Sequence, residues 1–210
     1  MTTFQPAGTR FFAPRAPVEI LSMGSDAEAT MLRAVLESLN AVVLMHHPGT
    51  PGDILTVLDR PRSEPSLLIL SGHGDDDGFI IQEVAEGIGV DLSMLVRPDR
   101  LPPQALAGRV HLPGWTVLST GCVTGSPAMV DVFRNAGVAA YIAPDDYPDG
   151  SDAVLFTIHV FHALIVRKAS VEDAWRRAAS YGGDSRMFQL HTPSLSLRVD
   201  DTGSVDRIGG

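Results

Sequence analysis

The single cysteine of the chain lies where a predicted strand gives way to a predicted helix. The apolar run 115–118 predicts a short buried strand, which small residues and then Cys122 follow. Ser126 and Pro127 are typical of an N-cap and a first helical residue, and Gly137 is typical of the position after a helix end. Open α/β sheets hold their active sites at this place, where the helix dipole favours a thiolate that can attack a carbonyl carbon.

A histidine occupies the equivalent place after a second apolar run. The run Leu67–Leu70 predicts another buried strand, and His73 follows it between Gly72 and Gly74. If the two strands are parallel neighbours, His73 and Cys122 emerge at the same edge of the sheet. An imidazole beside a thiol can move the protons of a nucleophilic reaction, so the pair predicts thiol-based catalysis.

The two segments resemble the catalytic motifs of the caspase-like (clan CD) cysteine peptidases. Leu70-Ser-Gly-His73-Gly74 is similar to their histidine motif, and Leu118-Ser-Thr-Gly-Cys122-Val-Thr-Gly125 is similar to their cysteine motif. The cysteine follows the histidine by 49 positions, close to the caspase spacing of about 50. Each motif is short, and the order and spacing of the two together carry the resemblance.

The sequence after the cysteine is similar to the CHAT family within that group. A predicted helix ends in Ala136-Gly-Val138, and a predicted strand follows it up to Pro144. Three later segments resemble the helix pair that ends CHAT domains, namely 152–156, 161–164 and 169–178. The resemblance runs from about residue 18 to residue 190, and Gly121 departs from it because many relatives carry alanine or another residue there.

This resemblance implies a three-layer α/β/α caspase-like fold, an α/β protein with a mostly parallel central sheet. It implies a cysteine endopeptidase in which Cys122 is the nucleophile and His73 is the general acid and base. It also implies that the backbone N–H groups of Gly74 and Cys122 form the oxyanion hole. No asparagine or aspartate that would orient His73 is identifiable in the sequence.

Two acidic clusters follow the predicted strand ends. Asp75, Asp76 and Asp77 come directly after the histidine motif, and Asp145 and Asp146 follow the next predicted strand. Solvated loop charge is one interpretation. The other, suggested by several caspase-like relatives, is that Asp75, Asp145 or Asp146 lines the S1 pocket and selects arginine or lysine.

The resemblance also implies partners. CHAT peptidases are often parts of bacterial antiviral defence or programmed-cell-death systems, in which a sensor activates the protease and a gasdermin-like or other effector protein is cut. We therefore expect a protein substrate and an activating partner. A catalytically idle caspase-like module that was kept for binding is the alternative.

The composition of the chain argues against several other classes of function. The chain has 210 residues, 44% of them hydrophobic, and a formal net charge of −9, which disfavours direct nucleic-acid binding. One cysteine cannot form an internal disulfide, and we recognise no secretion signal or membrane-spanning run, so a cytoplasmic location without membrane contact is expected. Nothing resembles a phosphate loop, and we expect no cofactor.

The remaining patterns outline one domain. We expect a flexible arm over 1–16, the peptidase domain over 17–195 and a loose tail over 196–210. His159 and His162 share a helical face without a third ligand nearby, so no metal site is expected. Further strands are expected at 18–21, 41–45, 79–82 and, as an edge strand, 187–191; helices are expected after Ser25 and Pro51, at 102–106, at 151–168 and after Ser170.

Overall fold

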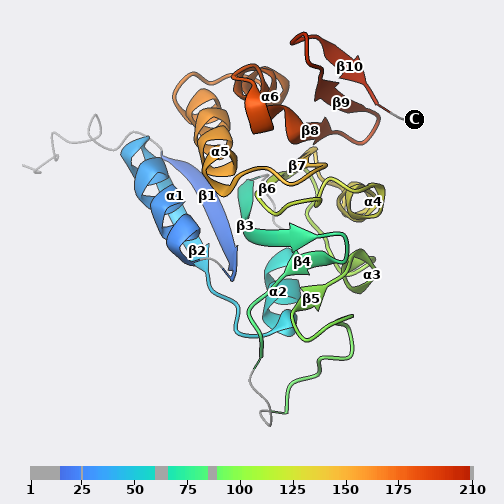
Figure 1. Cartoon of the computed structure of the whole chain (residues 1–210). Coiled ribbons are helices and arrows are strands. Elements are labelled where there is room, and N and C mark those ends of the chain that lie inside the picture. The colour runs from blue at the N-terminus through green and yellow to red at the C-terminus, as the bar shows by residue number, and fades with distance from the viewer. Residues whose placement is uncertain (1–14, 25, 60–65, 85–88, 209–210) are drawn as a thin grey trace, which may run out of the picture.

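A central β-sheet organises the chain. In the computed structural model, residues 15–24, 26–59, 66–84 and 89–208 are described. Within these residues the main sheet has the strand order β10-β9-β8-β7-β6-β3-β1-β2 (Figure 1). Strands and helices alternate along the first part of the chain, which is the pattern expected of a parallel sheet covered by helices.

Five neighbouring strands of the sheet run parallel. From the outer edge inward they are β2 (Ala41–His46), β1 (Ala16–Met23), β3 (Leu67–Asp75), β6 (Thr116–Ser119) and β7 (Ala140–Pro144). Continuous apolar runs predict such strands because helices cover both faces of a parallel sheet. The expected strands at 18–21, 41–45 and 115–118 correspond to β1, β2 and β6.

Three antiparallel strands complete the far side of the sheet. These are β8 (Phe188–His191), β9 (Ser196–Val199) and β10 (Val205–Arg207). The expectations that 187–191 is an edge strand and that 196–210 is a loose tail were therefore wrong. The strands β9 and β10 are short, so their sequence shows no strong period. Leu197 and Val199 of β9 are buried, and β10 pairs with β9.

The strand β3 continues beyond its parallel neighbours. Its last three residues pair antiparallel with β4 (Gly78–Ile80), which in turn pairs with β5 (Arg100–Leu101). Figure 1 shows this small extension projecting from the end of β3. His73 therefore lies within β3, paired with Ile80, and not in a loop after the strand.

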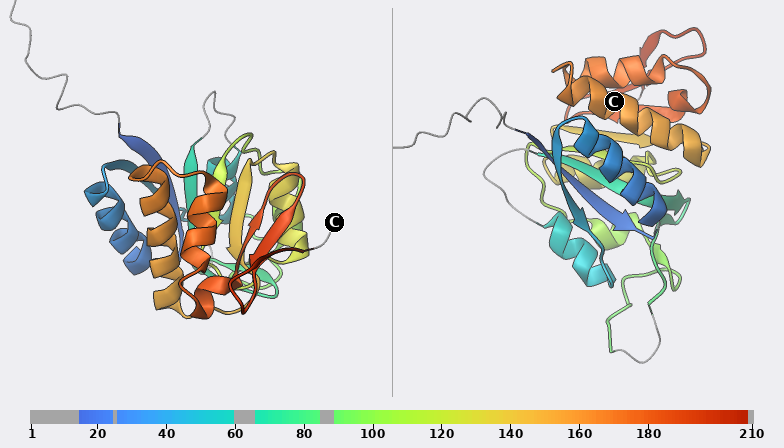
Figure 2. Two further views of the ribbon diagram at one scale, coloured as in Figure 1. Left: turned by 90° about the horizontal axis from the view of Figure 1, so that it is seen from above. Right: turned by 90° about the vertical axis from the view of Figure 1, so that its left-hand side faces the viewer.

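Helices cover both faces of the sheet, so the expected three-layer α/β/α architecture is confirmed (Figure 2). One layer contains α1 (Asp26–Ser38), α5 (Gly150–Ile165) and α6 (Val171–Ala179), followed by a 3₁₀ turn at Gly183–Met187. The opposite layer contains α2 (Pro51–Leu58), α3 (Pro103–Leu106) and α4 (Pro127–Asn135). A separate apolar core lies between the sheet and each layer.

Capping residues and glycines in the sequence mark the ends of several helices. Ser170 accepts a hydrogen bond from the Asp173 N–H, as the capping pattern predicts, and Gly137 has a φ of 82° after α4. Ser25 and the expected arm, apart from residues 15 and 16, lie outside the described residues. Trp175 is fully buried, and its Nε1–H donates to the Phe188 carbonyl at 2.7 Å, which ties α6 to β8.

Across the described ranges, each helix is too short or too polar to cross a bilayer.

We predict that replacing Leu197 by alanine lowers the free energy of unfolding by about 2–4 kcal/mol, because it removes buried side-chain atoms and leaves a cavity. Leu197 is 6% exposed and packs in the core that α5 and α6 share with the sheet. Urea denaturation of the purified protein measures the change.

The matched control for this prediction is Val96→Ala. Val96 is 58% exposed, so its truncation should change the free energy of unfolding by less than about 0.5 kcal/mol. An equally small effect of Leu197→Ala would show that 196–207 does not contribute to the folded core.

Candidate active site

The parallel pairing of β3 with β6 brings the histidine and cysteine motifs together. Leu70 and Ser119 form the last pair between β3 and β6, so His73 and Cys122 each lie three residues beyond that pair. The two segments leave the same edge of the sheet, as expected for parallel neighbours. The register of this one strand pair therefore sets the relative position of the imidazole and the thiol.

Glycines allow the two backbones to approach closely at this edge. A Cβ atom on Gly74 would collide with the Cys122 carbonyl oxygen and lie 3.3 Å from the Cys122 nitrogen. A Cβ on Gly121 would lie 3.2 Å from the His73 carbonyl carbon and oxygen. In the described part of the chain, the Cys122 N–H donates to no backbone carbonyl of another residue. A polarised carbonyl oxygen of a substrate could therefore accept from this N–H.

Hydrogen bonds hold the turn that carries the cysteine. The Val123 N–H donates to the Asp146 carbonyl at 3.0 Å, and the Gly125 N–H donates to the Pro144 carbonyl at 2.7 Å. The Tyr141 hydroxyl donates to the Thr124 carbonyl at 2.8 Å from the fully buried interior. Val123 has a φ of 58°, which is strained for a β-branched residue, so the surrounding bonds must impose this conformation.

The Cys122 thiol is half-buried and lies under the loop that follows β7. Its sulfur is 4.0 Å from the Pro148 carbonyl oxygen, a weak S–H contact. Burial raises the pKa of this thiol, and the negative charges of Asp146 and Glu28 raise it further. The expectation that the environment favours a thiolate was therefore wrong for this resting arrangement, because desolvation and two carboxylates act against the negative sulfur.

His73 is exposed at the same edge. Its ring nitrogens have no hydrogen-bond partner among the residues that the structure describes, so the thiol and the imidazole are not hydrogen-bonded to each other here. Catalytic hydrogen bonds are often long before substrate binds and tighten in the complex.

The acidic cluster after His73 is engaged in structural contacts. Asp75 accepts a hydrogen bond from the Arg100 Nε–H at 2.7 Å and one from the Asp77 N–H at 3.0 Å. Although desolvation raises the pKa of Asp75, these contacts together hold it below its usual value. Asp77 pairs with Arg97, and Asp76 accepts from the Tyr147 hydroxyl at 3.2 Å. The carboxylate of Asp75 is thus engaged in an ion pair with Arg100.

The two aspartates after β7, Asp145 and Asp146, lie in different environments. Asp145 accepts a hydrogen bond from the Gln189 amide and lines a pocket of about 540 Å³ beside α4, together with the buried His191. Burial raises the pKa of Asp145. The charge of Asp146 instead acts on Cys122. Of the three aspartates that the sequence suggested for substrate binding, Asp146 is the one placed beside the thiol.

Glu28 is a site residue that the sequence analysis missed. It lies in the first turn of α1, and its carboxylate oxygen Oε1 accepts hydrogen bonds of 2.7 Å from both the Ser71 and Thr120 hydroxyls. Glu28 lies three residues after Ser25, which is the spacing of a capping box, and this explains the omission because a glutamate there is usually assigned to the helix start. Only the tertiary structure places it between the two motif strands.

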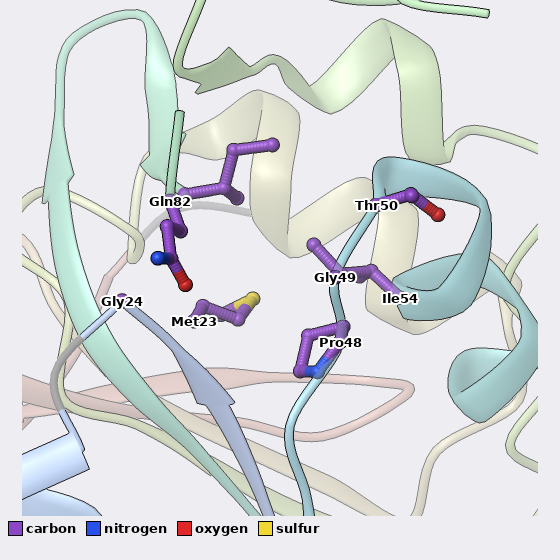
Figure 3. A pocket seen from close by; sticks show the side chains of 8 residues that line it. Met23, Gly24, Pro48, Gly49, Thr50, Ile54 and Gln82 are labelled. Atoms are coloured by element: carbon purple, nitrogen blue, oxygen red, sulfur yellow. The ribbon is translucent and has the colours of Figure 1, made fainter. Parts of the chain in front are cut away.

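A small pocket lies on the other side of the site, between the ends of β1 and β2 (Figure 3). Met23, Gly24 and Gln82 face Pro48, Gly49 and Thr50 across it. Its volume of about 10 Å³ is close to the minimum for one water molecule, so it is too small for a substrate side chain.

The described residues contain no group of three or more His, Cys, Asp or Glu side chains placed to hold a metal ion. His159 is stacked on Tyr181 with ring centroids 4.1 Å apart, and burial lowers its pKa. His159 therefore has a packing role against Tyr181.

Comparison with known proteins gives matches at the level of structure. No family model and no curated protein matches the sequence. The complex of Porphyromonas gingivalis RgpB pro- and mature domains matches with a TM-score of 0.50 and 12% identity, covering 81% of this chain and 44% of that one. A secreted C11 cysteine protease from Bacteroides thetaiotaomicron, iotapain, matches with a TM-score of 0.47 and 11% identity, covering 87% of this chain and 67% of that one.

Both structures are clan CD caspase-like cysteine proteases. The chain has a caspase-like fold. It spans less than half the length of the RgpB chain that it matches. This fold explains why β3, which carries His73, lies beside β6, which precedes Cys122. The CHAT family itself is not among the matches.

We predict that Gly74→Ala lowers the free energy of unfolding by about 1–3 kcal/mol and reduces the reactivity of Cys122, because the new Cβ overlaps the Cys122 carbonyl and forces the two segments apart. Urea denaturation and the rate of Cys122 alkylation by iodoacetamide measure the two effects.

Gly52→Ala is the control for a glycine with space. An added Cβ there would lie 3.6 Å from Thr50 Oγ1, an ordinary contact within α2. This variant should gain about 0.5–1 kcal/mol of stability, since alanine favours a helix. If Gly74→Ala behaved like Gly52→Ala, the close approach of the two motifs would be refuted.

Proposed function

We propose that the chain is a caspase-like cysteine endopeptidase with a His73–Cys122 dyad. The observation that carries the proposal is the close backbone approach of the Gly74 and Cys122 segments at one edge of the sheet. This approach supports the proposal because it brings the segments that carry the proposed nucleophile, proton carrier and N–H donor into one small region. The fold shared with RgpB supports the same reading.

The proposed reaction proceeds through a thioester. His73 takes the proton of the Cys122 thiol, and the thiolate attacks the carbonyl carbon of the scissile peptide bond. The N–H groups of Gly74 and Cys122 donate to the oxygen that becomes negative. The protonated His73 then gives its proton to the leaving amine, and water hydrolyses the thioester to release the acid and restore the thiol.

The resting site suits an enzyme that a partner activates. The thiol contacts the Pro148 carbonyl, and its pKa is raised by burial and by nearby carboxylates. A partner that moved the loop after β7 would free the sulfur for His73. We propose that such a partner is a sensor or effector protein, as in the bacterial defence systems of the CHAT family that the sequence resembles.

An idle binding module is the second candidate function. The absence of a hydrogen bond between Cys122 and His73 in the described residues favours it. Both candidates predict the same fold, and they differ in whether the thiol forms a covalent product with a peptide-like electrophile.

We predict that peptidyl acyloxymethyl ketones label wild-type protein on Cys122, because attack by an activated thiolate displaces the carboxylate leaving group. Cys122→Ala should give no adduct, and His73→Ala should react at least about 100-fold more slowly, as expected when a general acid and base is removed. Intact-mass spectrometry measures the adduct.

Circular dichroism of both variants provides the control, since neither side chain contributes to the apolar cores. Equal labelling of the wild type and of His73→Ala would refute the assignment of His73 as the general acid and base for Cys122. Absence of label in the wild type, even after addition of candidate partner proteins, would favour the binding module.

We further predict that the preferred reagent carries arginine or lysine at P1, because the charge of Asp146 makes the surroundings of the thiol negative. Asp146→Asn should reduce the preference for arginine over leucine at P1 about tenfold, corresponding to about 1.4 kcal/mol. Second-order labelling rates for the two reagents measure this preference.

Asp145→Asn is the matched control, because the neighbouring carboxylate is bonded to Gln189 and lies beside α4. It should leave the P1 preference unchanged. An aspartate preference at P1 in the wild-type protein would exclude an acidic S1 pocket.

A further inference from the structure

We infer that Glu28 is a positioning residue of the proposed active site, whose carboxylate holds the ends of β3 and β6 together through the Ser71 and Thr120 hydroxyls. This inference rests on the proposed function, because it assigns Glu28 a role in the placement of His73 and Cys122. Nothing in the comparison with RgpB or iotapain assigns it.

The geometry is symmetric about the two motifs. Ser71 lies two residues before His73, and Thr120 lies two residues before Cys122. Both hydroxyls donate to the same oxygen of Glu28, each at 2.7 Å. Hydrogen bonds to an ionised acceptor are shorter and stronger than neutral ones, so one carboxylate oxygen bridges the two strands immediately before they carry their reactive side chains.

The bridge extends to the residue that precedes the histidine. The Gly72 N–H donates to Thr120 Oγ1 at 3.1 Å. The Thr120 hydroxyl has one proton, and its shortest acceptor is Glu28 Oε1; the Leu70 and Gly72 carbonyls are farther away at 3.4 and 3.3 Å. Because the Thr120 hydroxyl donates to Glu28, its oxygen is oriented to accept a hydrogen bond from the Gly72 N–H.

Glu28 is itself held by a well-packed helix. Ala29, Leu32 and Leu36 of α1 are fully buried against the sheet. The carboxylate therefore reaches the strand ends from a third, independently anchored element. Such support from a neighbouring element is what keeps reacting groups in a productive geometry.

The position of Glu28 has an electrostatic cost. The charged groups that face Cys122 are Glu28 from α1 and Asp146 from the loop after β7, and His73 lies on the adjacent strand. The charge of Glu28 raises the pKa of the thiol, which works against thiolate formation. A carboxylate at this place thus needs a compensating role, and the bridge between the strands supplies one.

Two variants of Glu28, a double-mutant cycle and one control variant test the inference. Glu28→Ala removes the shared acceptor, whereas Glu28→Gln removes the charge and keeps an oxygen that can accept both hydroxyl protons. Glu37→Ala removes an exposed glutamate of the same helix, which pairs with Arg33. Ser71→Ala combined with Thr120→Val forms a double-mutant cycle between two residues joined through Glu28.

For Glu28→Ala we expect the second-order rate of Cys122 labelling by a peptidyl acyloxymethyl ketone to fall at least about tenfold, and amide exchange to accelerate in 70–74 and 119–125 alone. Glu28→Gln should lose less than about threefold and should shift the pH profile of Cys122 alkylation to lower pH, because loss of the negative charge lowers the thiol pKa. Glu37→Ala should match the wild type in every readout.

The double-mutant cycle keeps the inference testable if Glu28→Ala does not fold. Once either hydroxyl is removed the bridge is broken, so the combined loss in Cys122 alkylation rate should be smaller than the product of the single losses. Independent effects of Ser71→Ala and Thr120→Val, or local exchange in Glu28→Ala equal to that of Glu37→Ala, would overturn the inference.

The outcomes also separate Glu28 from the proposed function. Amide exchange and alkylation need no peptidase activity, so they test the bridge even if the wild-type protein cleaves nothing. A change of P1 preference in Glu28→Gln would make Glu28 a substrate-binding group and overturn the positioning role, while the His73–Cys122 dyad would stand.

Discussion

The pairing of β3 with β6 is the interaction on which the rest of the site depends. It aligns Leu70 with Ser119, so His73 and Cys122 each follow this last β3–β6 pair by three residues. A shift of one residue would turn side chains to the opposite face of the sheet. Burial of both strands between two helical layers makes such a shift costly, so the packing of the cores protects the geometry of the edge.

Small residues convert this alignment into close contact. Gly74 and Gly121 let the two segments touch through their backbones, and the strained Val123 is held by bonds from the loops after β7 and around Thr124. The strain is local and the support comes from several elements. This arrangement is typical of functional sites, where surrounding structure imposes a conformation that the isolated chain would avoid.

Charge at the site opposes the nucleophile in the resting state. Burial and the carboxylates of Asp146 and Glu28 disfavour the thiolate of Cys122, while the thiol contacts the Pro148 carbonyl. A cationic substrate group or a movement of the loop after β7 would relieve this effect. Within this small region, Asp146 thus connects the proposed substrate choice with activation, and Glu28 connects structural support with the protonation of the thiol.

Short-range patterns in the sequence were sufficient to predict the parallel strands, most helix ends and the shared edge of His73 and Cys122, whereas the three layers were implied by the resemblance to caspase-like peptidases. Apolar runs, caps and glycines carry that information because they act over a few residues. The strands β9 and β10, the occupation of Asp75 by Arg100 and the bridge of Glu28 to Ser71 and Thr120 were decided by tertiary structure alone. Each of these depends on partners far apart in the chain, which no local pattern records.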